Sequence, residues 1–176
     1  MLKTVKQRVR IPVAVKLSPF YTAPAHFARR LSDAGADALV LFNRFYQPDI
    51  DPEKLDTSRH LTLSSPLELP LRLRWLAILS GRLRPSLAVT GGVHDAVDAV
   101  KAIMAGAHAV QMVSALLRGG PECLRRIREE TVAWMQEHEY GSLEQMRGSM
   151  SLDACPDPSV YERANYMLML QGWKAV

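Results

Sequence analysis

The sequence predicts an α/β protein in which short parallel strands alternate with helices. Four short apolar runs occur along the chain, and each is followed by a segment with helical spacing of its apolar residues. Such alternation is typical of a parallel sheet covered by helices. The chain has 176 residues, 48% hydrophobic and 23% charged, which fits one globular domain and excludes a disordered or low-complexity protein.

The first half of the chain supplies two of these strands. Residues 11–17 (IPVAVKL) read as a buried strand, and residues 23–34 as an amphipathic helix closed by Gly35. Residues 38–42 (ALVLF) form the second expected strand. Residues 43–63 are predicted to be a long polar connection, a length that is uncommon unless the segment is functional or ordered by a ligand.

A clear helix start follows this connection. Ser65 is expected as the N-cap, with Pro66 at the first helical position and Glu68 completing a capping box. The helix is predicted to run to about Arg82. Its apolar stripe consists of Leu69, Leu73, Leu76 and Leu79.

The rest of the chain repeats the pattern and then becomes helical. The expected strands are 87–90 and 109–113, and the expected helices are 95–105, 114–118, 121–138, 142–147 and 159–171. We therefore expect an α/β unit over residues 1–140 and a C-terminal helical extension over residues 141–176. Strands buried on both faces fit either a doubly wound sheet or part of a (β/α)8 barrel, for which 176 residues is short.

Charge and composition exclude several classes of partner. The net charge is +4, but the arginines are spread over several predicted helices and mixed with Glu129 and Glu130, which indicates solvated helix faces rather than a nucleic-acid site. These arginines are Arg72, Arg74, Arg82, Arg84, Arg118, Arg125, Arg126 and Arg128. No apolar run is long enough for a membrane span, and the basic N-terminus lacks the apolar segment of a secretory signal.

Cysteines and histidines supply no recognisable metal or catalytic site. Cys123 and Cys155 lie far apart, without metal-type spacing, so we expect a reducing, cytoplasmic setting and no metal site. His94 and His108 flank a helix and are expected on the surface. The methionines of the last helix, Met167 and Met169, are expected in core or interface packing.

Two loops at strand ends favour a phosphate ligand. Thr90-Gly91-Gly92 lets backbone approach a ligand closely, and Val113-Ser114-Ala115 opens a one-turn helix with free N–H groups. Taken by itself, the Gly91-Gly92 pair is explained equally well by a tight turn between strand and helix as by a ligand. The occurrence of both loops after the last two strands favours phosphate.

Lys16 and Asn43 stand at the ends of the first two strands. A lysine flanked by Val15 and Leu17 is costly to bury unless it meets a negative partner, although an edge lysine reaching solvent is the alternative. Asn43 can exchange hydrogen bonds with a planar ligand, or instead cap a turn. At the carboxyl ends of strands, both residues are expected to point into an active site.

These motifs together resemble the flavin-dependent dihydroorotate dehydrogenase family. The matching segments, in the family's order, are IPVAVKLSP, ALVLFN, LAVTGGV and AVQMVSALL. FNRFYQPDID and EQMRGSMS resemble the subgroup of dihydroorotate dehydrogenase-like proteins. The resemblance covers nearly the whole chain.

The resemblance implies the C-terminal half of a (β/α)8 barrel that binds FMN, with four strands equivalent to the fifth through eighth. It implies that Lys16 contacts the flavin ring and that Asn43 contacts the substrate. Gly91, Gly92, Val113 and Ser114 match the donors around the FMN phosphate. Ser64 and Ser65 stand where orotate-forming members carry a glycine-rich segment, and they can still donate to flavin, although dihydroorotate is less expected as the substrate.

The implied function is that of an FMN-dependent oxidoreductase acting on a CH–CH bond of a small planar substrate, in cytoplasmic pyrimidine metabolism. The family's catalytic base lies before the strand matching residues 11–17, and residues 1–10 supply none, so no catalytic residue is assigned. The alternatives are a non-catalytic phosphate- or flavin-binding half-barrel and a structural homodimer. Because an open half-barrel exposes sheet edges, we expect self-association or a missing N-terminal half.

Overall fold

The computed structural model describes residues 1–162 and 165–172 of the chain. Its main sheet has four parallel strands in the order β1-β2-β5-β6, formed by Ala14–Leu17, Ala38–Leu41, Ser86–Thr90 and Ala109–Gln111. The predicted α/β class and the four parallel strands are confirmed. Residues 163–164 of the expected last helix and 173–176 of the expected extension lie outside the described residues.

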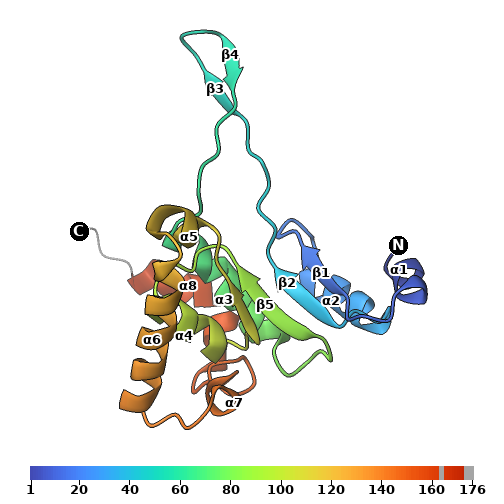
Figure 1. The fold of residues 1–176 in the computed structure, drawn as a ribbon, viewed down its shortest axis with the longest axis vertical. Helices are drawn as coiled ribbons and strands as arrows, with labels where there is room; N and C mark the ends of the chain where they lie inside the picture. Colours follow the sequence, from blue (N-terminus) through green and yellow to red (C-terminus); the bar gives the residue numbers. More distant parts are fainter. Residues whose placement is uncertain (163–164, 173–176) are drawn as a thin grey trace.

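Helices follow the strands and cover one face of the sheet (Figure 1). Their bounds are α1 Leu2–Arg8, α2 Pro24–Asp33, α3 Leu69–Leu79, α4 Ala96–Met104, α5 Ser114–Gly119, α6 Glu122–Glu137, α7 Leu143–Met146 and α8 Asn165–Gly172. Helix α3 packs against α2 and α4, and α4 packs against α6. The apolar stripe expected on α3 is confirmed, since Leu69, Leu76 and Leu79 are buried and Leu73 packs against the core.

The strand register sorts side chains onto two unlike faces. Leu39 pairs with Leu87, and Leu41 with Val89, so these buried leucines and valines face the helices. The other face carries small residues, because Ala88 pairs with Ala109.

This second face is open along the two edge strands. Lys16 and Ala14 on β1 are exposed, and so are Ala109 and Gln111 on β6. The expectation that every strand is buried on both faces is therefore wrong for β1 and β6. The physical reason is that β1 and β6 are edge strands with a neighbour on one side only, whereas Val40 and Ala88 on the central strands of this inner face are buried.

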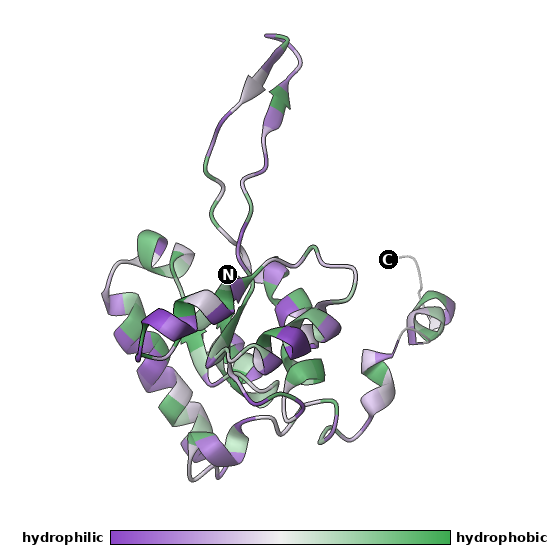
Figure 2. Cartoon of the chain, turned by 90° about the vertical axis from the view of Figure 1, so that its right-hand side faces the viewer, coloured by the Kyte–Doolittle hydropathy of each residue, from purple (hydrophilic) through white to green (hydrophobic). Residues whose placement is uncertain are grey.

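Residues 43–63 form an arm that stands clear of the body in two perpendicular views (Figures 1 and 2). The segment was predicted to be a long polar connection. It contains a hairpin, in which Asp49–Asp51 (β3) pairs antiparallel with Asp56–Ser58 (β4). Asp51 shapes the hairpin turn, since its carboxylate accepts the N–H groups of Glu53 and Lys54.

The helix expected at residues 65–82 begins and ends differently. Pro66–Glu68 forms a 3-10 turn (η1) before α3, and the Ser65 hydroxyl makes no capping hydrogen bond. The capping-box prediction is therefore wrong, because the Glu68 carboxylate turns instead to Arg72 and Arg44. The helix ends at Leu79 rather than Arg82.

The segment after α6 packs back on the body. The Gly148 and Met150 N–H groups donate to the carbonyls of Ile103 and Met104 at the end of α4. Met146 is fully buried. The segment continues through a 3-10 turn (η2, Pro158–Tyr161) into α8. Met167 and Met169 on α8 are exposed, so of the core or interface packing expected for them the core alternative is wrong and the interface alternative stays a prediction.

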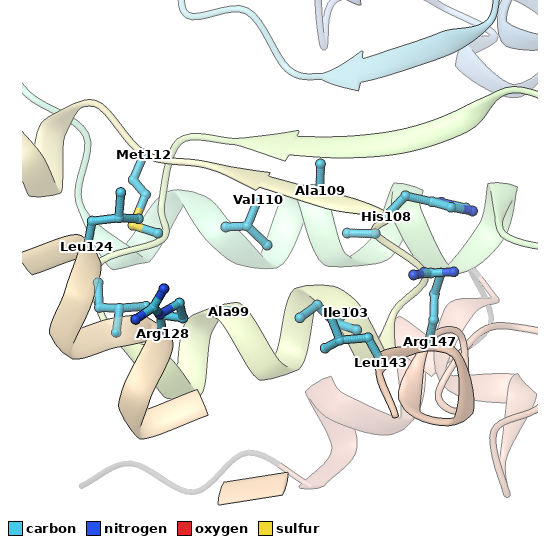
Figure 3. A pocket seen from close by; sticks show the side chains of 12 residues that line it. Ala99, Ile103, His108, Ala109, Val110, Met112, Leu124, Arg128, Leu143 and Arg147 are labelled. Atoms are coloured by element: carbon cyan, nitrogen blue, oxygen red, sulfur yellow. The ribbon is translucent and has the colours of Figure 1, made fainter. Parts of the chain in front are cut away.

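A groove runs beside β6, between that strand and helices α4, α6 and α7 (Figure 3). Its lining is mostly apolar, with Val110 from β6, Met112 directly after β6 and Leu124 from α6. His108 and Arg147 lie together at one end in Figure 3. The groove and the unpaired edge of β6 are thus adjacent features of the same side of the molecule.

Within residues 1–162 and 165–172, no helix combines the length and apolarity needed to cross a bilayer. The same residues contain no cluster of three or more His, Cys, Asp or Glu side chains able to hold a metal ion.

Candidate functional site

A cleft lies at the carboxyl ends of the four parallel strands. It is lined from β1 by Lys16, from the segment after β2 by Asn43, and from the end of β5 by Thr90 and Gly91. Val113 and Ser114 contribute the start of α5. The remaining lining residues are Phe42, Arg44, Leu61, Leu63, Ser64, Arg72 and Leu117.

The cleft gathers most of the site residues expected from the sequence, although they lie up to about a hundred positions apart. Lys16, Asn43, Ser64, Gly91, Val113 and Ser114 all line it. Ser65 and Gly92 follow lining residues in the chain but are not part of the lining. The ligand contacts of all eight residues stay predictions.

Lys16 is exposed on an edge strand rather than buried between apolar neighbours. The expectation that its ammonium needs a buried negative partner is therefore wrong for this chain. Lys16 shares the open inner face with Val40, its register partner on β2. Its ammonium is accessible to a ligand that enters the cleft.

Hydrogen bonds tie three loops together at one wall of the cleft. The Ser64 N–H donates to the Ser114 hydroxyl at 2.9 Å, and the Ser64 Oγ lies 3.5 Å from the His94 Nε2. The His94 N–H in turn donates to the Asp98 carboxylate of α4 at 3.0 Å. Because its oxygen accepts from Ser64, the Ser114 hydroxyl keeps its own proton for donation to a ligand.

His94 was expected on the surface, and the structure corrects this. Its ring is half-buried beside Ser64 because the Gly91–Gly92 turn folds the following residues back toward the 61–65 segment. The sequence offered no local signal for this contact, since Ser64 and His94 are 30 positions apart.

The glycine pair has a packing reason as well as the expected ligand reason. Both residues adopt positive φ, +83° for Gly91 and +85° for Gly92. A Cβ at Gly92 would lie 2.6 Å from the Leu69 backbone nitrogen, and a Cβ at Gly91 would lie 2.8 Å from Arg72 Nη2. Glycine is therefore required here by backbone conformation and by close contact with α3.

Arg72 is a site residue that sequence reasoning missed, because it was expected on a solvated helix face. Its side chain is only 6% exposed. Its Nε donates to the Thr90 carbonyl at 2.6 Å, and its Nη1 donates to the Glu68 carbonyl at 2.6 Å. The i, i+4 spacing of Glu68 and Arg72, which form an ion pair at 3.2 Å, is the one signal in the sequence.

The cleft is positively charged. Lys16, Arg44 and Arg72 line it, and the Glu68 carboxylate is shared by the two arginines at 3.4 and 3.2 Å. Burial lowers the pKa of Arg72, an effect opposed by Glu68, yet an arginine stays charged at any physiological pH. Three cations against one carboxylate favour an anionic ligand.

The chain is similar to known proteins of one family. The family model for dihydroorotate dehydrogenase matches residues 1–135. Similar curated proteins are catalytic subunits of dihydroorotate dehydrogenase B (NAD(+)). The one from Citrifermentans bemidjiense is 32% identical over 155 residues, 86% of this chain and 50% of its own. The one from Petrotoga mobilis is 35% identical over 140 residues, 78% of this chain and 46% of its own.

Solved structures lead to the same family. The DHODH of Eimeria tenella in complex with ferulenol matches with a TM-score of 0.64 and 25% identity, over 81% of this chain and 38% of its own. The chain thus spans about half the length of the curated relatives it matches. The family model covers well over half of the sequence, and the chain therefore belongs to the dihydroorotate dehydrogenase family.

Proposed function

We propose that this chain is the cofactor-holding half of an FMN-dependent oxidoreductase that acts on a CH–CH bond of a small planar substrate. The observation that carries the proposal is the cleft, in which a lysine, an asparagine, two serines and a glycine turn converge from four strand ends. Convergence at the carboxyl ends of parallel strands is where barrel enzymes bind substrates and phosphates.

The donor set of the cleft fits FMN. Gly91 leaves room for close approach of backbone, and the Ser114 hydroxyl has a proton to donate. Arg44 and Arg72 complement the charge of a phosphate group. We assign the phosphate end to Gly91, Gly92, Val113 and Ser114, and further flavin contacts to Ser64 and Ser65.

Lys16 and Asn43 would serve the reacting end of the site. FMN, when bound, supplies the ring that exchanges a hydride with the substrate. The Lys16 ammonium, held on β1, would stabilise negative charge on the reduced ring. Asn43, in the segment that follows the neighbouring strand β2, would orient the substrate with its amide donor and acceptor.

The catalytic base is not assigned to any residue of this chain. We propose that it comes from a separate N-terminal half-barrel that pairs with this chain. The open inner face of β1 and β6 and the apolar groove beside β6 (Figure 3) favour such pairing. The same features favour a second candidate, a non-catalytic half-barrel that binds FMN or phosphate and self-associates.

Flavin titration tests the proposal. Quenching of FMN fluorescence should saturate with the wild-type chain, and Lys16→Met should weaken it without altering the circular dichroism spectrum, because Lys16 is exposed. Val5→Ala, at an exposed position on α1, is the control. A chain that binds inorganic phosphate but never flavin would reject the oxidoreductase.

Two further measurements separate the candidates. Anaerobic addition of dihydroorotate to the flavin-loaded chain should leave the flavin spectrum unchanged, since the base lies elsewhere. Light scattering should give a mass above 19.7 kDa if copies pair. A monodisperse monomer would contradict self-association and leave an N-terminal half as the proposed source of the base.

A further inference from the structure

The guanidinium of Arg72 lies directly against the turn that we assign to the phosphate. Its Nη2 would be 2.8 Å, and its Nε 3.2 Å, from a Cβ placed on Gly91. Its Nε donates to the carbonyl of Thr90, the last residue of β5, at 2.6 Å. The side chain therefore touches both residues joined by the Thr90–Gly91 peptide bond.

An anchored carbonyl fixes the orientation of the following N–H. The peptide group is planar and trans, so the Gly91 N–H points opposite to the Thr90 carbonyl that Arg72 holds. The other end of the guanidinium is fixed to η1, through the Glu68 carbonyl at 2.6 Å. Arg72 thus orients the peptide at the end of β5 from a buried, doubly anchored position.

The charge of Arg72 is largely balanced within the protein. The Glu68 carboxylate accepts from its Nη2 at 3.2 Å, on a side chain that is itself 28% exposed. This pairing reduces the attraction of Arg72 for a ligand and leaves its geometric role. Arg44, which shares Glu68 at 3.4 Å and is 39% exposed, is the more accessible charge.

We propose that Arg72 is a positioning residue, which sets the Thr90–Gly91 peptide so that the Gly91 N–H faces the phosphate of the ligand. The inference rests on the proposed flavin function but concerns its phosphate end alone. Lysine cannot replace the guanidinium, because one ammonium cannot span two carbonyls and a carboxylate in the planar fork that Arg72 uses.

The test compares three probes: FMN, riboflavin, which lacks the phosphate, and inorganic phosphate. Arg72→Met should weaken binding of FMN and phosphate about tenfold, the size expected when one hydrogen bond from the Gly91 N–H to a charged phosphate is lost. Riboflavin affinity should change less than about twofold. Arg74→Met, two residues along α3 and outside the cleft, is the matched control and should change none of the three.

Two additions keep the test decisive. Arg72→Lys retains the positive charge and should still lose FMN affinity. It replaces Arg72→Met in the test if that variant does not fold. Guanidinium ion should restore part of the FMN affinity of Arg72→Ala, because alanine leaves open the buried space that the guanidinium group of Arg72 occupies.

The outcomes separate the two proposals. Equal weakening of FMN and riboflavin, or no weakening of either, overturns the positioning role. A wild-type chain that binds phosphate but no flavin rejects the flavin function alone, and the phosphate affinities of the Arg72 variants then decide the inference. A wild-type chain that binds none of the probes rejects both.

Discussion

The backbone N–H of Ser64 donates to the side-chain oxygen of Ser114 at 2.9 Å, across 50 positions of the sequence. This bond joins the end of the arm to the first turn of α5, and it holds two lining segments of the cleft together. Because Ser64 contributes its backbone N–H and Ser114 its side chain, a substitution at Ser114 should affect fold stability and ligand binding at once.

Ser114→Ala should lower the free energy of unfolding by about 1–2 kcal/mol, because the half-buried Ser64 N–H loses its acceptor. FMN affinity should fall as well, since a donor is removed from the proposed phosphate end. Urea unfolding and fluorescence titration measure the two effects. Ser86→Ala, at an exposed position where β5 begins, is the control and should alter neither.

Three glycine-to-alanine variants separate backbone conformation from close packing. Gly81→Ala should cost about 1 kcal/mol, because its φ of +74° is unfavourable but its Cβ meets nothing within 4 Å. Gly92→Ala should cost well over twice as much, since its Cβ would press on the Leu69 backbone at 2.6 Å. Gly91→Ala should fall between them, because it meets the side chain of Arg72. Equal midpoints in urea for all three would contradict the packing argument.

The strands could be predicted because their apolar runs are local signals, and the cleft followed from the rule that parallel strands present their carboxyl ends at one edge. The positions of Lys16 near the end of β1 and of Gly91 directly after β5 were enough to place both residues at the cleft. The burial of Arg72 could not be predicted, since it depends on the carbonyl of Thr90, 18 positions away. The i, i+4 spacing of Glu68 and Arg72 is, by itself, equally typical of a solvated helix face.

The failed capping box shows how a local rule yields to a tertiary contact. Ser65 and Glu68 have the correct spacing, but Glu68 lies between two arginines, one of them from the arm. An ion pair with a buried guanidinium outweighs a reciprocal cap at a solvent-exposed helix start. The exposure of Lys16 has a different cause, because an open inner face is a property of the assembled sheet rather than of β1 alone.

Two helix starts should respond differently to alanine. The Asp95 side chain accepts the Asp98 N–H at 2.8 Å and caps α4, so Asp95→Ala should cost about 1 kcal/mol of stability. Ser65→Ala should leave the unfolding midpoint unchanged, because its hydroxyl makes no capping bond. Because the stability of Ser65→Ala is unchanged, the FMN affinity of this variant reports on the proposed flavin contact alone. A stability loss in Ser65→Ala matching that of Asp95→Ala would show that the capping box forms after all.

Mild acid should destabilise the sheet through His108. Its Nδ1 accepts the Leu87 N–H at 3.2 Å, which links the starts of β5 and β6, and this requires the neutral ring. Burial, with a contribution from the positive charge of Arg147, lowers the pKa of His108 below the ordinary 6.5. The folded state therefore binds this proton less readily than the unfolded state does. The stabilisation contributed by the neutral His108 ring is fully present above pH 6.5 and is lost as the pH falls through the folded-state pKa.

The variant His108→Gln removes this titration. Its free energy of unfolding should fall less between pH 8 and pH 5 than that of the wild type, measured by urea denaturation along a pH series. His60→Gln on the exposed arm is the control and should follow the wild-type curve. Parallel curves for the wild type and His108→Gln would mean that His108 binds its proton equally well in the folded and unfolded states, and that the acid sensitivity of the sheet has another source.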